Sequence, residues 1–146
     1  MSVNVEVAGE AAHVRIEVIG YENPAAENLS DANWLTCRVE VRVRGFEGRV
    51  DASFTTQEFA AFSRSLRSAV SDLKGEATFE TDEDALRLDV KFNTTGKAAV
   101  TGTLHEPDRP RTTLTFSFES DQTFMRRTVD ALNEVTRQFP VRAIGT

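Results

Sequence analysis

The sequence of 146 residues predicts an α+β fold: a curled, mostly antiparallel sheet of about eight strands with two helices packed on one face, in the order ββββαββββα. Eight segments alternate apolar and polar residues, which is typical of strands that bury one face of an antiparallel sheet. Two segments instead repeat apolar residues every three or four positions, as amphipathic helices do. Ser-Phe followed by a polar cap introduces both helices, within residues 53–59 and 117–124. A chain of this length is expected to form one domain, residues 1–146.

Four strands and one long loop are predicted before the first helix. Branched apolar residues alternate with polar ones in segments 3–7 and 14–18. The clearest alternation covers residues 35–43, and residues 50–54 follow it after a glycine-containing turn. Segment 21–33 is rich in Asn, Pro, Ala, Glu and Ser and has no period, so we predict a long surface loop there.

The first helix has recognisable signals at both ends. Thr55 and Glu58 have the spacing of a capping box, in which each side chain accepts a hydrogen bond from the other residue's backbone N–H. Apolar residues then recur at helical spacing from Phe59 to Leu73. Gly75 is expected to end the helix because glycine readily adopts a positive φ.

Four more strands and a second helix complete the predicted fold. The second helix is expected to begin at Ser120 or Asp121 and to end before Pro140, which cannot continue it. The four strands form a meander, and their inward-facing residues lie in segments 77–79, 86–92, 98–104 and 114–118.

The width of such a sheet limits how it can pack. Eight strands spaced about 4.8 Å apart span nearly 40 Å. Two helices, each about 10 Å across, cover roughly half of that width. Either the sheet curls around its helices, which we favour, or its uncovered part packs against a second copy in a homodimer.

Composition narrows the range of partners. The net charge is −6, whereas binding to nucleic acid depends on clustered Lys and Arg, so no nucleic acid partner is expected. The charge serves solubility or steers the chain toward a basic partner.

No apolar run approaches the roughly 20 residues of a membrane helix, and the first residues do not resemble a secretory signal, which predicts a cytoplasmic protein. The single cysteine, Cys37, lies on an apolar strand face and is interpreted as a core residue.

Known catalytic and ligand-binding motifs are missing from the sequence, so we expect no catalytic residue, no metal and no cofactor. The two histidines, His13 and His105, lie far apart in the sequence. The acidic run Asp82-Glu83-Asp84 falls in a predicted turn, where solvated acids are common. It lacks the ligand spacing of a calcium loop, and a patch that faces a partner is the main alternative.

The only Tyr and the only Trp of the chain, Tyr21 and Trp34, flank the long loop. Trp34 is expected to anchor the loop on the sheet edge, with Asp31 capping a turn through its side chain. Alternatively, these aromatic residues form a hot spot for a protein partner. The polar face of segment 38–42 is either a solvated sheet face or a docking surface. The candidate partner-binding residues are Tyr21, Asp31, Trp34, Asp82, Glu83 and Asp84.

Three short motifs resemble the WapI-type family of bacterial immunity proteins. They are Asp31-Ala-Asn-Trp-Leu35, Gly45-Phe-Glu-Gly48 and Asp121-Gln-Thr-Phe124, and the resemblance extends from about Tyr21 to Phe139. It implies a cytoplasmic antidote that binds the toxic C-terminal domain of a contact-dependent toxin, often a nuclease. The hypothesis for this chain is therefore stoichiometric occlusion of the toxin domain, without turnover.

Two other function classes stay open at this point. One is a small acidic secretion chaperone, although the usual chaperone topology starts with a helix. The other is a small-molecule carrier or an enzyme with a pocket between sheet and helices. The candidate lining of that pocket is Phe54, Phe59, Phe62, Phe92, Phe116, Phe118 and Phe124.

Overall fold

The computed structural model describes residues 2–107 and 111–143, which form two antiparallel sheets and three helices. The first sheet has the order β1-β2-β3-β4 and the second has the order β5-β6-β7-β8. The strands are β1 (Val3–Ala8), β2 (Ala12–Tyr21), β3 (Trp34–Val43), β4 (Phe46–Thr55), β5 (Gly75–Phe79), β6 (Leu86–Phe92), β7 (Lys97–His105) and β8 (Thr113–Asp121). The predicted α+β class and the order of the long elements are confirmed.

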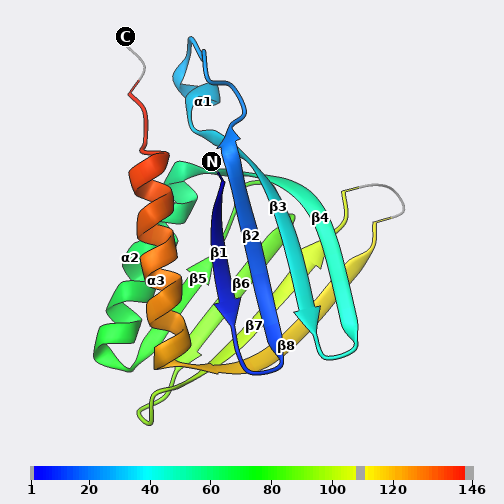
Figure 1. Cartoon of the computed structure of the whole chain (residues 1–146), viewed down its shortest axis with the longest axis vertical. Helices are drawn as coiled ribbons and strands as arrows, with labels where there is room; N and C mark the ends of the chain where they lie inside the picture. Colours follow the sequence, from blue (N-terminus) through cyan, green and yellow to red (C-terminus); the bar gives the residue numbers. More distant parts are fainter. Residues whose placement is uncertain (1, 108–110, 144–146) are drawn as a thin grey trace.

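The strands form two layers and not one curled sheet. Helix α2 (Thr56–Asp72) leads the chain away from β4, so β4 and β5 never pair. It packs against helix α3 (Gln122–Gln138), and the helix pair contacts β5 through α2 and β1 through α3 (Figure 1). The helices therefore close the open side between the two sheets. Folding into two layers removes the excess width that a single sheet would have had.

Both long helices begin where the sequence predicts. The Thr55 N–H donates to Glu58 Oε1 at 2.7 Å, and the Glu58 N–H donates to Thr55 Oγ1 at 3.2 Å, which completes the capping box. Asp121 caps α3 by accepting the N–H of Phe124 at 2.9 Å. These two helix starts are confirmed because they depend on backbone groups that the neighbouring side chains satisfy.

The predicted helix end at Gly75 is wrong. Helix α2 ends at Asp72, Leu73 is its C-cap in the left-handed conformation with a φ of +50°, and Gly75, with a φ of +87°, begins β5.

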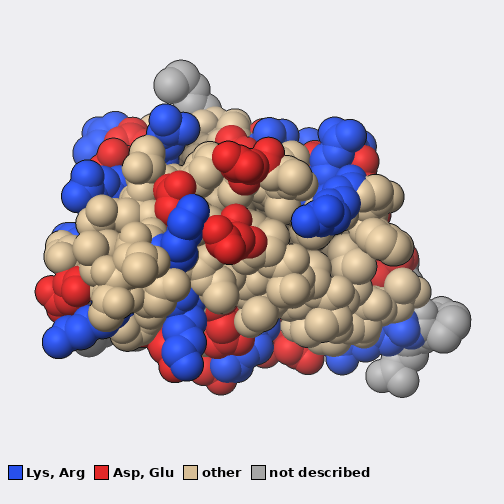
Figure 2. All heavy atoms as spheres, turned by 90° about the horizontal axis from the view of Figure 1, so that it is seen from below, with Lys and Arg blue, Asp and Glu red and all other residues tan. Residues whose placement is uncertain are grey.

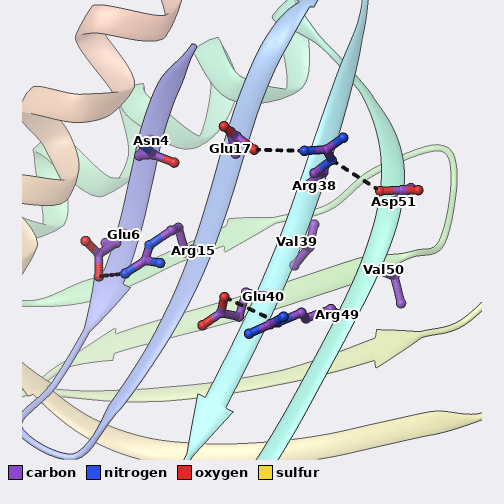
Figure 3. A pocket seen from close by; sticks show the side chains of 10 residues that line it. All are labelled: Asn4, Glu6, Arg15, Glu17, Arg38, Val39, Glu40, Arg49, Val50 and Asp51. Atoms are coloured by element: carbon purple, nitrogen blue, oxygen red, sulfur yellow. Dashed lines mark ion pairs between the residues drawn. The ribbon is translucent and has the colours of Figure 1, made fainter.

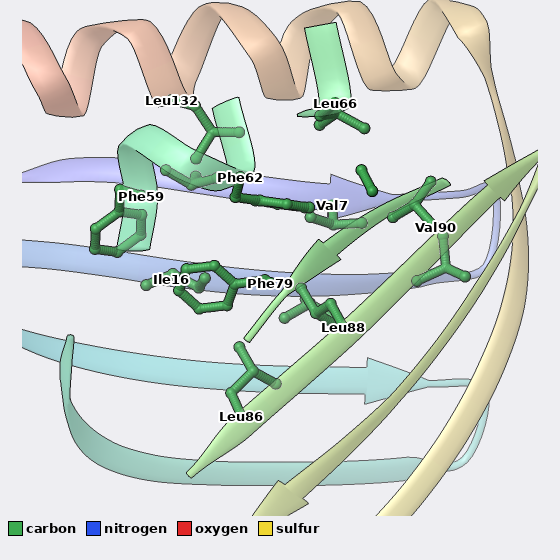
Figure 4. Packing of buried hydrophobic residues seen from close by; sticks show 14 of the residues in the cluster. Val7, Ile16, Phe59, Phe62, Leu66, Phe79, Leu86, Leu88, Val90 and Leu132 are labelled. Atoms are coloured by element: carbon green, nitrogen blue, oxygen red, sulfur yellow. The ribbon is translucent and has the colours of Figure 1, made fainter. Parts of the chain in front are cut away.

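The core lies between the two sheets and is sealed by the helix pair (Figure 4). Phe79 of β5 lies at the centre of an aromatic cluster. Its ring centroid is 5.1 Å from that of Phe54, 5.3 Å from that of Phe59 and 5.4 Å from that of Phe62. All four side chains are fully buried. Phe54, Phe59 and Phe62 are therefore core residues and do not line an open pocket.

Cys37 is also a core residue, as predicted. It is buried on β3 among the inward-facing valines. Burial raises the pKa of its thiol to about 12, because the charged thiolate is disfavoured away from water. The thiol is therefore uncharged and unreactive at neutral pH.

The long loop between β2 and β3 contains a helical turn that the sequence pattern does not predict, α1 (Leu29–Ala32). Figure 1 shows it projecting at one end of the molecule, beside the C-terminal segment. Within the part of the chain that the structure describes, no helix is both long and apolar enough to cross a membrane.

Candidate partner-binding site

The loop that carries α1 is held in place by the C-terminal segment. The Tyr21 hydroxyl donates to the Pro140 carbonyl at 2.6 Å. The Tyr21 ring meets Phe139 edge to face at 5.6 Å, and the Arg142 guanidinium lies 3.8 Å from the Tyr21 ring centroid. Partial burial raises the pKa of the Tyr21 hydroxyl, although the positive charge of Arg142 opposes this. Tyr21 therefore anchors the loop through both its ring and its hydroxyl.

Arg142 fixes the loop from the other side, and the sequence analysis did not identify it. Its side chain donates to the carbonyls of Asn23 and Pro24, each at 2.9 Å, and to that of Ala32 at 2.8 Å. Its backbone N–H donates to Asn33 Oδ1 at 2.7 Å. Because three backbone carbonyls share one guanidinium, the loop has a defined shape although it contains only one helical turn.

Asp31 lies at this end of the molecule, but it does not cap a turn. Asn28 is the N-cap of α1, since its side-chain oxygen accepts the Asp31 N–H at 3.0 Å. The Asn28 amide then donates to the Asp31 carboxylate, also at 3.0 Å. The predicted capping role of Asp31 is therefore wrong, and its exposed carboxylate is the partner of the capping residue.

Trp34 and Asp82 lie on the same hollow, which we call the end groove. Its volume is about 570 Å³. Glu58 connects its two sides, since Oε1 accepts the Thr55 N–H and Oε2 accepts the Asp82 N–H at 2.6 Å. The acidic turn is thereby attached to the start of α2, next to the loop. The groove is lined by Leu29, Ser30, Asn33, Trp34, Thr55, Gln57, Glu58, Ala61, Glu80 and Asp82.

The lining of the end groove combines apolar surface with negative charge. Trp34 is half-buried, and Leu29 is 61% exposed. The charged residues of the lining, Glu58, Glu80 and Asp82, are all acidic. An aromatic side chain beside carboxylates suits a lysine or arginine side chain, which gains both an ion pair and a cation–π contact.

Glu83 and Asp84 lie on the other side of the same turn and border a second hollow of about 320 Å³, which we call the edge hollow. Asp84 accepts a hydrogen bond from Arg111 at 3.2 Å and lies 3.9 Å from His105 Nε2. His105 Nδ1 lies 2.8 Å from the Thr113 hydroxyl. The edge hollow is lined by Thr36, Cys37, Asp51, Ala52, Ser53, Glu83, Asp84, Ala85, His105, Pro107 and Arg111.

Within residues 2–107 and 111–143, no three His, Cys, Asp or Glu side chains gather so that they could hold a metal ion.

The outer face of the first sheet is the third candidate surface, with a hollow of about 790 Å³ (Figure 3). Its charges are paired across neighbouring strands. Arg38 lies 3.9 Å from Glu17 and 3.8 Å from Asp51, and Arg49 lies 3.6 Å from Glu40. Positive and negative groups therefore alternate across this face, which leaves little field of a single sign for a partner.

The end of the molecule farthest from α1 is also mixed in charge. Figure 2 shows acidic and basic side chains interspersed there over a largely uncharged surface. The net charge of −6 is thus not spread as a uniform acidic coat, and the all-acidic lining of the end groove differs from these two faces.

Glu40 on the sheet face provides a test of pH dependence. A hydrogen bond from His13, with Nε2 3.0 Å from Glu40 Oε1, lowers the pKa of the Glu40 carboxyl, and Arg49 adds to this effect. The stabilisation is present above the unfolded-state pKa, near pH 4.3, and is lost as the pH falls through the lower folded-state value. Glu40→Gln should cost less than about 1 kcal/mol at neutral pH. Urea denaturation should detect this difference at about pH 7 and show it shrinking near pH 3; a cost that stays constant over this range would contradict the assignment.

The comparison with known families identifies the chain. The model of the immunity protein WapI-like family matches residues 7–140. The chain belongs to the WapI-like immunity protein family. This confirms the resemblance seen in the sequence. No curated protein matches the chain.

The motifs that resemble the WapI-like family have structural positions that explain their residue types. Asp31 to Leu35 link α1 to β3 and bring Trp34 to the end groove. Gly45 and Phe46 lie at the β3–β4 turn, and Asp121 caps α3. Only the first motif therefore contributes side chains to the candidate partner-binding site.

Proposed function

We propose that this chain is an immunity protein that neutralises a cognate toxin domain by stoichiometric occlusion, without catalysis, in the cytoplasm. Membership of the WapI-like family supports the immunity role. We further propose that the end groove, with Trp34 and Asp82 in its lining, is where the toxin domain docks. The edge of the groove near Asp31 and the acidic turn at Glu83 and Asp84 then flank the contact.

One observation carries the choice of the end groove: two segments distant in the sequence meet there in a hollow whose charged residues are all acidic. A nuclease domain presents basic side chains where it holds phosphates. Carboxylates steer such a surface into place, and Trp34 offers the kind of aromatic anchor that dominates binding energy at protein interfaces. The paired charges of the outer sheet face offer neither feature.

Co-expression with a candidate toxin domain, taken from the product of the neighbouring gene, tests the immunity role. We expect a 1:1 complex on size-exclusion chromatography at micromolar concentration, and growth of cells that make both proteins. Cells that make the toxin domain alone should die. Absence of association at micromolar concentration, together with loss of protection, would refute the proposed function.

A further inference from the structure

Strand β4 is an edge of the first sheet, and no described residue pairs with the backbone on its outer side. Among the described residues, β4 pairs only with β3. The opposite edge, β1, is covered by α3 and the end of β8: the Thr128 hydroxyl donates to the Glu6 carbonyl at 2.6 Å, and the Ser120 hydroxyl donates to the Ala8 carbonyl at 2.5 Å. Hydroxyl groups thus satisfy carbonyls of β1, whereas no such bond from residues 2–107 or 111–143 reaches the backbone of residues 46–54.

The hairpin geometry identifies which groups of β4 are free. A two-residue turn connects Val43 to Phe46, and such a turn closes on a hydrogen-bonded pair. Phe46 and every second residue after it direct their backbone N–H and C=O groups toward β3. The intervening residues direct the same groups away from β3, toward the free edge; these residues are Glu47, Arg49, Asp51 and Ser53. Thr55 agrees with this alternation, because its N–H turns away from β3 to bond Glu58.

The backbone of this free edge is regular enough to pair with a further strand. All ten residues of β4 pair with β3 in an unbroken register, whereas the β2–β3 ladder shifts between Val18 and Gly20. The strand contains no proline and no lysine, two of the residues that commonly block edge pairing. The outward backbone groups therefore form a continuous row of donors and acceptors.

The edge hollow lies beside this row. Asp51, Ala52 and Ser53 of β4 border it on one side, and residues 83–85 together with His105, Pro107 and Arg111 border it on the other. A strand placed next to β4, about 4.8 Å away, would extend the first sheet over this hollow. Every second side chain of the added strand would then point toward this hollow. Its described lining has three acids, Asp51, Glu83 and Asp84, and also contains His105 and Arg111, which already bonds Asp84.

We infer that the free edge of β4 receives an extended segment of the toxin domain as a fifth strand, with a lysine or arginine side chain directed into the edge hollow. This inference rests on the proposed function. The end groove and the edge hollow share the acidic turn at residues 82–84, so one partner can occupy both. A basic segment is favoured over a second copy of the chain because a second copy presents the same acidic residues.

A proline at Asp51 separates backbone pairing from side-chain contact. Asp51→Pro removes an N–H that points away from β3, and proline is tolerated on edge strands. Asp51→Ala is the matched control, since it removes the same carboxylate and keeps the N–H. We expect Asp51→Pro to weaken toxin binding about tenfold more than Asp51→Ala does, as the loss of a backbone hydrogen bond and a clash with the added strand imply. Thermal unfolding followed by circular dichroism checks that both variants fold.

Hydrogen exchange on the wild-type complex gives a second readout that needs no variant. Binding of the toxin domain should slow exchange of the Glu47, Arg49, Asp51 and Ser53 amides. Unchanged exchange, with equal affinities of the two Asp51 variants, would overturn the β4 pairing and leave the immunity role intact. Protection of the same amides in the isolated chain, with a dimer on chromatography, would show that a second copy fills the edge. Failure of the wild-type chain to bind the toxin domain would refute both proposals.

Discussion

Phe79→Ala is expected to destabilise the fold by about 3–5 kcal/mol, the usual cost of removing a buried phenylalanine ring. Phe79 is fully buried and touches three other aromatic rings, which come from β4 and α2. These elements hold the two sheets and the helix pair together, so the cavity would open where three layers meet. The loss exceeds the transfer energy of the ring alone because rigid neighbours cannot collapse into the space.

Urea denaturation measures this loss, and Phe46→Ala is the matched control. Phe46 has the same side chain but is 70% exposed at the β3–β4 turn. Its replacement should change the unfolding free energy by no more than about 0.5 kcal/mol. Similar losses of unfolding free energy for the two substitutions would mean that the aromatic cluster around Phe79 is not the centre of the core.

The sequence predicts the local elements well because their signals are local. Alternation marks the strands, and the caps at Thr55 and Asp121 mark the helix starts. The division into two sheets leaves no such mark, since a strand with one buried face reads the same in one layer or two. It depends on how far α2 carries the chain from β4, and therefore on packing between elements.

The candidate site illustrates the same limit. Trp34 and Asp82 are visible in the sequence as separate features, but the hydrogen bond from the Asp82 N–H to Glu58 brings them together. The capping role of Glu58 is predictable from the sequence, but the hydrogen bond that its second carboxylate oxygen accepts from the Asp82 N–H is not. Arg142 has no local signal at all, because its bond partner Asn33 lies 109 residues away in the chain.

Trp34→Ala is expected to weaken binding of the toxin domain by at least about 30-fold, or 2 kcal/mol, if the end groove is the docking site. The side chain is half-buried in the lining of the groove, so its removal also loses buried apolar area and costs some stability, which has to be measured separately from binding. Isothermal titration calorimetry measures the affinity, and a thermal melt verifies the fold. An unchanged dissociation constant for Trp34→Ala would exclude the end groove as the energetic centre of the interface.

Asp82→Lys is expected to act on the association rate as well as on affinity. Reversing a charge in an all-acidic groove repels a basic surface during approach, so the defect should diminish as salt screens the field. Asp130→Lys is the matched control, because it makes the same charge change on the exposed face of α3. Equal slowing of association by the two variants, measured by stopped flow at low and high salt, would indicate that only net charge guides the toxin domain. A larger defect for Asp82→Lys, combined with the loss caused by Trp34→Ala, would instead place both attraction and anchoring in one groove.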